Sequence, residues 1–252
     1  MGQNHKIMLY LVPTPIGNLE DMTYRSVRIL KEVDYILAED TRSSRPLLQH
    51  YAIDQPLYAH HAHNEQESSL QVVNDLKAGK SVALISDAGT PGISDPGFYL
   101  LRACVAEGLA VSCLPGASAV IPALVGAGLA CDRFHFEGFL PHKKGRQTRL
   151  DYLADLPNTF ALYESPHRLE KCLEQLAQVC GEERQAVVCR ELSKKFESFH
   201  RGNLAELQAF FKAQPDKVRG EIVIVVEGQT QKKTKKDKYA KFKKAPKRPE
   251  LD

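Results

Sequence analysis

The segment best suited to bind a ligand is SDAGTPGISDPG, residues 86–97. It follows an apolar run and contains three glycines and two prolines. Glycine allows positive φ angles and a close approach of main-chain groups to a ligand. A tight turn would explain one or two of these residues, but not the whole segment. Because the loop carries Asp87 and no lysine, it favours an adenosine-type or cationic ligand.

The known phosphate-binding loops do not match. A Walker loop needs a lysine followed by Ser or Thr, and a dinucleotide fingerprint needs GxGxxG after the first strand. The segment VPTPIGN (12–18) has one glycine, and GAG (126–128) lacks the third. The sequence therefore disfavours a phosphate cradle.

Further polar loops follow other apolar runs. They are VPTPIGN, LPGASA (114–119), YESPHR (163–168) and AEDTR (38–42). Several strand-end loops that converge can form a small-molecule site between two halves of a protein. Glu39 and Asp40, next to Arg42, are candidates for a functional role, and an acid pair at a helix N-terminus is the alternative.

The histidines of YAHHAHNE (58–65) do not have the spacing of a zinc site, because one- and two-residue separations do not place three imidazoles on one helix face. We therefore expect no metal. A polar loop, or contacts to RNA or substrate, fits this segment better.

A basic segment, HKKGRQTR, occupies residues 142–149 around an expected helix start. Cations oppose the helix dipole there, so phosphate contact is a reasonable function for Lys143, Lys144, Arg146 and Arg149. A solvated surface run is the alternative.

Charge is unevenly distributed along the 252 residues, which have a net charge of +3. Residues 231–252 carry +7, and the first 230 residues carry −4. We expect the tail to be disordered, because its sparse apolar residues cannot offset the entropy of ordering. It could be a solubilising tail or an RNA-binding arm in which Tyr239 and Phe242 stack on bases.

Composition excludes several protein classes. The early apolar run at 7–12 is too short to span a bilayer and lacks the flanks of a signal peptide. The six cysteines are widely spaced, as expected for buried thiols in a reducing compartment. These features predict a cytoplasmic protein with no membrane contact.

The pattern of apolar runs predicts an α/β protein with a largely parallel sheet. Expected strands are 7–13, 34–39, 81–86, 109–114, 159–163, 185–190 and 221–227. Expected helices are 19–33, 64–78, 95–107, 116–129, 143–155, 166–180 and 203–213, with Asn18, Asp95 and Ser165 as N-caps. We expect an N-terminal α/β domain at 1–120, a C-terminal α/β domain at 121–230 and the basic tail at 231–252.

Taken together, these motifs closely resemble the ribosomal RNA small subunit methyltransferase I family, from about residue 9 to residue 228. The segments that carry the resemblance are VPTPIGNLEDMTYR, AEDTRSSRPLL, HHAHNE, ISDAGTPGISDPG, PGASA, GFLPHKKGR, YESPHR, CRELSKKFE and RGEIVIVVEG. The resemblance implies the two-domain tetrapyrrole-methylase fold, with S-adenosylmethionine in the interdomain cleft, and a homodimer. It also implies methylation of a cytidine ribose 2′-hydroxyl in the decoding region of small-subunit (16S) ribosomal RNA, as free RNA or in the 30S subunit.

The same resemblance implies site residues. The cofactor would contact Asp87, Ala88, Gly89, Thr90, Ile93, Ser118, Ala119, Leu162, Tyr163 and Leu192. VPTPIGN stands where tetrapyrrole methylases have a GxGxGD-like loop. VPTPIGN lacks most of these glycines and the terminal acid, which favours a substrate other than a tetrapyrrole.

Methyl transfer to a hydroxyl requires alignment of the acceptor oxygen and a base for its proton. Glu39, Asp40 and His61 are the candidate bases, with Arg42 orienting a phosphate or carboxylate. One alternative function is a tetrapyrrole-type small-molecule methylase, against which the departure at VPTPIGN and the basic segments argue. The other is a non-catalytic RNA-binding or ribosome-assembly protein, which would not need the intact 86–97 loop.

Overall fold

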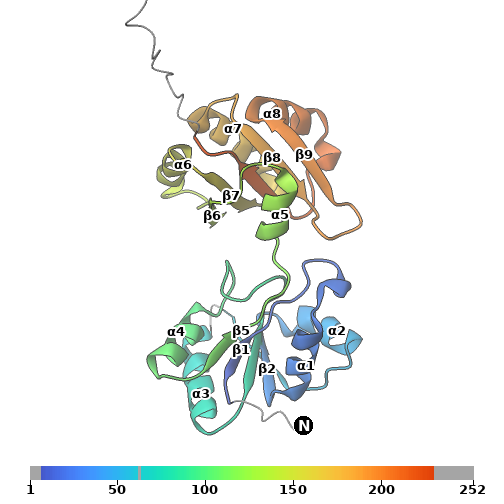
Figure 1. Cartoon of the computed structure of the whole chain (residues 1–252), viewed down its shortest axis with the longest axis vertical. Coiled ribbons are helices and arrows are strands. Elements are labelled where there is room, and N and C mark those ends of the chain that lie inside the picture. The colour runs from blue at the N-terminus through green and yellow to red at the C-terminus, as the bar shows by residue number, and fades with distance from the viewer. Residues whose placement is uncertain (1–6, 62–63, 230–252) are drawn as a thin grey trace, which may run out of the picture.

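The computed structural model describes residues 7–61 and 64–229. The chain forms two lobes, each built on a five-stranded sheet (Figure 1). His63 and the basic tail at 231–252 lie outside the described residues, so the expected disorder of the tail stays a prediction.

The first sheet is entirely parallel, in the strand order β3-β2-β4-β1-β5. Its strands are β1 (Leu9–Leu11), β2 (Tyr35–Ala38), β3 (Leu57–Ala59), β4 (Val82–Ile85) and β5 (Val111–Cys113). Parallel strands place their carboxyl ends on one edge, where α/β proteins usually bind ligands. The loops after β1, β2, β4 and β5 therefore start from the same edge.

Helices cover both faces of this sheet. They are α1 (Tyr24–Glu32), α2 (Thr41–His50), α3 (Glu65–Lys77) and α4 (Phe98–Ala106), with a short 3-10 turn η1 (Leu19–Asp21) before α1. Alternate strand residues point to opposite faces. Thus Tyr10 packs with Ile29 and Leu30 of α1, whereas Leu11 packs in the cluster that holds Leu100 of α4.

The second sheet has the order β6-β7-β10-β8-β9, and among its neighbouring strands only β6 and β7 run parallel. Its strands are β6 (Phe134–Phe139), β7 (Thr159–Glu164), β8 (Gln185–Arg190), β9 (Ser198–Asn203) and β10 (Ile222–Val226). The expectation of a largely parallel sheet is thus confirmed for the first lobe and wrong for the second. The reason is that β10 inserts antiparallel between β7 and β8.

One face of the second sheet packs against α6 (Arg146–Ala154), α7 (Leu169–Cys180) and α8 (Leu204–Ala213), and the other against α5 (Val120–Ala127). Two 3-10 turns, η2 (Pro166–Arg168) and η3 (Pro215–Lys217), complete the lobe. The side chains of Ala123 and Leu124 join those of Val223 and Val225 in one buried cluster. A domain boundary at residue 120 stays a prediction, and α5, which begins there, packs on the second lobe.

All seven predicted strands are present, but several predicted helix starts are wrong. Helix α5 begins at Val120 instead of 116, and α7 begins at Leu169, after the 3-10 turn η2, instead of at 166. The expected helix 19–33 is divided into η1 and α1. Helix α4 begins at Phe98 with Gly97 as its N-cap, so Asp95 is not a cap. Helix α6 begins at Arg146, three residues later than expected.

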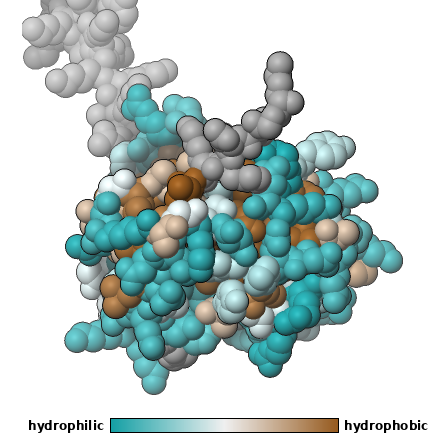
Figure 2. Space-filling model, turned by 90° about the horizontal axis from the view of Figure 1, so that it is seen from below, coloured by the Kyte–Doolittle hydropathy of each residue, from teal (hydrophilic) through white to brown (hydrophobic). Residues whose placement is uncertain are grey.

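The surface of the molecule is largely polar. The face shown in Figure 2 is mostly hydrophilic, with hydrophobic residues in small, separate areas. None of the helices in residues 7–61 and 64–229 is long and apolar enough to cross a bilayer. All six cysteines are free, and Cys113 is exposed, contrary to the expectation that all would be buried.

Candidate functional site

Two strand-end loops of the first lobe are joined by a backbone bridge. Thr14, in VPTPIGN after β1, exchanges two hydrogen bonds of 2.9 Å with Gly89 in the loop after β4. The hydroxyl of Thr14 donates to the carbonyl of Ser86 at 2.9 Å. These hydrogen bonds therefore fix the two loops relative to each other at the carboxyl edge of the sheet.

The loop of residues 86–97, which we name the cofactor loop, exposes several of its predicted contact residues. Asp87 and Ala88 are exposed, and Ile93 presents an apolar side chain that is 48% exposed. Gly89 is buried with φ +82°, and a Cβ there would lie 3.7 Å from Cγ2 of Ile16. The hydroxyl of Thr90 donates to the carbonyl of Ala117 at 3.2 Å, next to Ser118 and Ala119. The structure thus brings 87–90 and 117–119 together.

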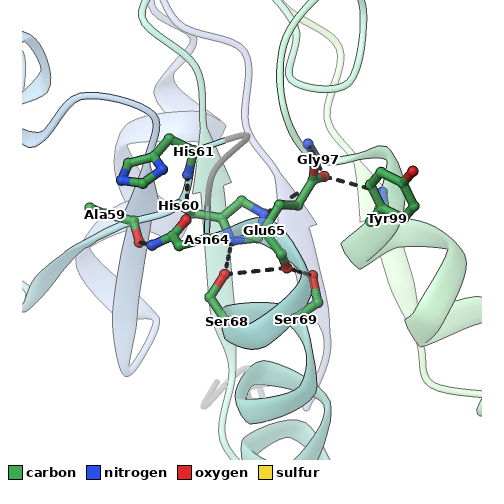
Figure 3. Close-up of polar contacts among 9 residues, drawn as sticks. All are labelled: Ala59, His60, His61, Asn64, Glu65, Ser68, Ser69, Gly97 and Tyr99. Carbon is green, nitrogen blue, oxygen red and sulfur yellow. Dashed lines mark hydrogen bonds and ion pairs between the residues drawn. The ribbon is translucent and has the colours of Figure 1, made fainter.

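Glu65 fixes the end of the cofactor loop (Figure 3). Its buried carboxylate accepts hydrogen bonds from the backbone N–H groups of Gly97 (2.8 Å) and Tyr99 (3.2 Å) at the start of α4. Orphan N–H groups at a helix start need such acceptors, and negative charge is favoured there. Sequence reasoning missed this contact because it joins residues more than 30 positions apart.

The histidine segment, residues 58–65, leads into Glu65, and several of its described residues are fixed by hydrogen bonds. His60 is fully buried, and its Nδ1 lies 2.7 Å from the hydroxyl of Ser68. Burial lowers the pKa of His60, which favours the neutral ring. The side chain of Asn64 accepts from the N–H of His61 and donates to the carbonyl of Ala59. His60 is therefore a structural residue, not a substrate contact.

Three carboxylates, those of Glu39, Asp87 and Asp95, lie near one another at the cofactor loop. Burial, then the negative charges of Asp87 and Asp40, raise the pKa of Glu39. Burial and the charge of Glu39 raise the pKa of Asp95 to about 6. Asp87 accepts a 2.5 Å hydrogen bond from the hydroxyl of Ser43. Sequence reasoning missed Asp95 because Asp-Pro is typical of a helix start.

Asp40 and Arg42 pair with each other. The carboxylate of Asp40 caps α2 by accepting from the N–H of Arg42 (2.8 Å), and it accepts from the guanidinium at 2.8 and 3.1 Å. These hydrogen bonds lower the pKa of Asp40 to about 2. So weak a base is poorly matched to proton abstraction near neutral pH. Its position fits the helix-cap alternative rather than a catalytic base.

The second lobe meets the cofactor loop through the ends of β6 and β7. A Cβ on Gly138 would lie 3.2 Å from the hydroxyl of Ser94. Burial and the charge of Asp95 raise the pKa of Tyr163, whose ring packs against Phe136 and Phe139 at centroid distances of 4.9 and 5.5 Å. Tyr163 thus lies near Asp95, and its cofactor role stays a prediction.

Leu162 and Leu192 are buried. Leu192 is 5% exposed and shares a cluster with Ile16 of the first lobe, whereas Leu162 is fully buried in the core on the α6–α8 side of the sheet. Any contact of Leu162 with a cofactor would therefore have to come from its backbone. Near Leu192, the hydroxyl of Ser193 donates to the carboxylate of Asp21, which joins the two lobes directly.

The four basic residues predicted to contact RNA differ in accessibility. Lys143 and Lys144 are exposed. Arg146 is 7% exposed and donates to Gln175, to the carbonyl of Pro141 and to Glu164, so its predicted contact with RNA does not fit its position. Arg149 forms a bidentate pair with Glu137 at 2.7 and 2.5 Å.

The chemistry of this site suits a cationic organic ligand. Three carboxylates, an exposed apolar side chain and main-chain groups line it, and negative charge would repel a phosphate. Within the described ranges, no group of three or more His, Cys, Asp and Glu side chains is placed to bind a metal ion. The donor set therefore fits a sulfonium compound such as S-adenosylmethionine.

The chain is similar to several known proteins. A family model described as Tetrapyrrole (Corrin/Porphyrin) Methylases matches residues 8–208. A protein of Haemophilus influenzae named "Ribosomal RNA small subunit methyltransferase I" is 48% identical over 223 residues, which are 88% of this chain and 79% of the relative. A protein of the same name from Pseudomonas aeruginosa is 50% identical over 221 residues, 87% of this chain and 78% of the relative.

Among solved structures, uroporphyrin-III C-methyltransferase from Thermus thermophilus, complexed with S-adenosylhomocysteine, is similar with a TM-score of 0.61. It is 19% identical, and the match covers 87% of this chain and 97% of the other. At this identity the likeness concerns the fold, which is the tetrapyrrole-methylase fold expected from the motifs.

Proposed function

The chain belongs to the ribosomal RNA small subunit methyltransferase I family of tetrapyrrole methylases, and from this premise we propose that it transfers a methyl group from S-adenosylmethionine to small-subunit ribosomal RNA. In finer detail, we propose that the acceptor is the 2′-hydroxyl of a cytidine ribose in the decoding region. The observation that supports the proposal is the bridge between Thr14 and Gly89, which ties the cofactor loop to the 12–18 loop, the segment that differs from the GxGxGD-like loop of tetrapyrrole methylases.

The residues that would hold the cofactor lie in three places. Asp87 to Thr90 and Ile93 would contact it from the cofactor loop, Ser118 and Ala119 from the loop after β5, and Leu162, Tyr163 and Leu192 from the second lobe. When bound, S-adenosylmethionine supplies an activated methyl group on a positively charged sulfur. The carboxylates of Asp87, Glu39 and Asp95 favour that charge. This support is electrostatic and does not depend on the identity of the acceptor.

A proton must leave the acceptor hydroxyl during or after transfer. Of the two acids predicted from sequence, Glu39 is the better candidate. Hydrogen bonds from Arg42 lower the pKa of Asp40 to about 2, which makes Asp40 a weak base. Asp95, with a pKa of about 6, is a second acceptor at the same edge. His61 lies close enough to Glu39 for its charge to affect the pKa of that carboxyl, and it stays a candidate.

We propose that Lys143 and Lys144 contact the RNA backbone, with 30S subunits or free 16S RNA as substrate. We also propose a homodimer in the cytoplasm. Exposed apolar side chains on α4, among them Phe98 (59% exposed) and Val105 (63% exposed), support self-association. Light scattering after gel filtration should give twice the chain mass of 28.1 kDa, and a mass of one chain would contradict the dimer.

The decisive experiment supplies labelled S-adenosylmethionine together with small ribosomal subunits, assembly intermediates or free 16S RNA. Nucleoside analysis should then find label on a cytidine ribose. Absence of ribose methylation on every one of these substrates would overturn the proposal. Label on a base instead of a ribose would retain the methyltransferase and overturn the 2′-hydroxyl.

A further inference from the structure

Two arginines surround a buried carboxylate where β7 ends. The side chain of Glu164 has no exposed surface, and its Oε1 accepts from Arg168 Nη2 at 2.6 Å and from the N–H of Ser165 at 2.8 Å. Its Oε2 lies 3.4 Å from Nη2 of Arg146. Glu164 thus fixes the position of both guanidinium groups.

The charges in this cluster do not balance. Two guanidinium groups share one carboxylate, and burial raises the pKa of the neighbouring Cys172 thiol to about 12, which keeps it neutral. Arg168 Nη1 lies 3.2 Å from Nδ1 of His142, and because arginine can only donate, that ring nitrogen accepts without adding negative charge. The excess positive charge lies on the buried Arg146 and the partly exposed Arg168, and it favours the binding of an anion.

Arg168 also has an unused hydrogen-bond donor. Its Nε–H is buried and has no hydrogen-bond partner among the described residues. The side chain as a whole keeps 22% of its surface exposed, so Arg168 is only partly shielded from solvent. By contrast, Arg146 is 7% exposed and donates to three partners. Arg168 is therefore the accessible arginine of the pair.

The cluster lies at the same edge of the second sheet as the candidate active site, but on the α6–α8 face, whereas Tyr163 lies on the α5 face. Strands β6 and β7 are parallel neighbours, so the loops that follow them start from the same edge. That edge contacts the cofactor loop, because Gly138 approaches Ser94 and the charge of Asp95 affects the pKa of Tyr163. The same two loops expose the side chains of His142, Lys143, Lys144 and His167.

We propose that Arg168, together with His142 and Lys143, binds a backbone phosphate of the RNA strand next to the nucleotide being methylated. The inference rests on the proposed function and adds the residues that hold the substrate. A planar guanidinium with several N–H groups matches the geometry of a phosphate, and Lys143 supplies a further point charge. The phosphate would provide the anion that the cluster lacks, whereas the acidic cofactor loop would stay selective for a cation.

The test measures binding of a short, fluorescently labelled single-stranded RNA to the full chain, by anisotropy over a series of KCl concentrations. Arg168→Gln should weaken binding about tenfold, which corresponds to the loss of a charge-assisted contact. The slope of log affinity against log salt should fall by about 0.7. Because a phosphate contact carries no sequence information, RNAs of different sequence should lose affinity by the same factor.

Three further variants separate binding from folding. Lys143→Gln leaves Glu164 and its partners unchanged, so it should fold normally and still reduce both the affinity and the salt slope. The matched control is Arg133→Gln, since Arg133 is exposed directly before β6, at the opposite end of the strand, and its loss should leave affinity unchanged. Arg168→Lys keeps the charge without the fork and should restore part of the affinity.

The outcomes distinguish this inference from the proposed function. If Arg168→Gln and Lys143→Gln both bind RNA with the affinity and slope of the unmodified chain, the phosphate site is wrong, even when RNA is methylated. If the unmodified chain binds no RNA, it is wrong as well. If the cluster binds RNA as expected but no RNA accepts a methyl group, the phosphate site stands and the proposed reaction fails. In an active enzyme, Arg168→Gln should raise KM for RNA about tenfold, with kcat nearly unchanged.

Discussion

Thr14 and Gly89 donate to each other's carbonyl oxygens at 2.9 Å, so the main chain of the cofactor loop is tied to the loop after the first strand. Because two hydrogen bonds must break together, neither segment can move alone. The bridge explains how a loop with a single glycine can still form one wall of the site: it contributes its backbone, and Gly89 provides the positive φ angle.

Substitution of Gly89 should therefore greatly weaken cofactor binding. In Gly89→Leu, the side chain would have to lie near Ile16 in a backbone with φ +82°, which displaces the loop. Calorimetry should show that the affinity for S-adenosylmethionine falls at least about tenfold, because several contacts of the loop with the cofactor would be lost together. The control Gly108→Leu carries similar backbone strain, with φ +67° and open space around it, and should bind normally. Unchanged binding by Gly89→Leu would disprove the placement of the loop.

The acids next to each other in AEDTR should behave differently. Glu39→Gln removes the candidate base and should lower kcat by about 100-fold or more while cofactor binding is retained. Asp40→Asn keeps a side-chain oxygen for the cap of α2 and should turn over nearly as fast as the unmodified chain. Single-turnover methyl transfer measures both. Loss of turnover in Asp40→Asn with normal turnover in Glu39→Gln would assign catalysis to the Asp40–Arg42 pair instead.

Asp95 should make folding stability depend on pH. Its pKa is raised from 3.8 to about 6, so the folded state binds this proton more tightly than the unfolded state does. The carboxyl therefore destabilises the fold as pH rises from about 4 to about 6. Asp95→Asn should increase the free energy of unfolding by about 1 to 2 kcal/mol above that range and have little effect below it. Urea titrations at both ends of the range would show this, and a gain that is independent of pH would contradict the titration of Asp95 as its cause.

Glu65 should act as a positioning residue for the cofactor loop. Glu65→Gln keeps an oxygen that can accept from Gly97 but removes the charge at the start of α4, and Glu65→Ala removes both. We expect affinity for S-adenosylmethionine to fall in the order Glu, Gln, Ala, by about tenfold overall. Calorimetry combined with melting curves checks this. If Glu65→Gln binds more tightly than Glu65→Ala while both variants melt at the same temperature, Glu65 positions the loop. If the affinity falls only in proportion to the melting temperature, the positioning role is wrong.

The strands were predictable where burial on both faces leaves an apolar run, as in Val82–Ile85 and Ile222–Val226. Strand β9 (Ser198–Asn203) was missed because an edge strand tolerates polar residues. Helix α2 was missed because Pro46 interrupts its pattern. The cofactor loop could be identified from its own residues. The burial of Arg146 could not, because Glu164 lies 18 positions away and reaches it only through the fold.

The carboxylates also predict a ligand preference that changes with pH. As pH rises from about 5 to about 7, Asp95 becomes charged and should attract a positive sulfur. S-Adenosylmethionine carries that charge and S-adenosylhomocysteine does not, while the rest of the two molecules titrates alike. Affinity for the first should therefore rise about fivefold relative to the second, which corresponds to about 1 kcal/mol between charges in a partly solvated site. Calorimetry with both ligands across this range gives the ratio. In Asp95→Asn the ratio should be constant, whereas Asp132→Asn, at an exposed acid before β6, should behave as the unmodified chain. A ratio that does not change with pH in the unmodified chain would place the sulfur away from Asp95.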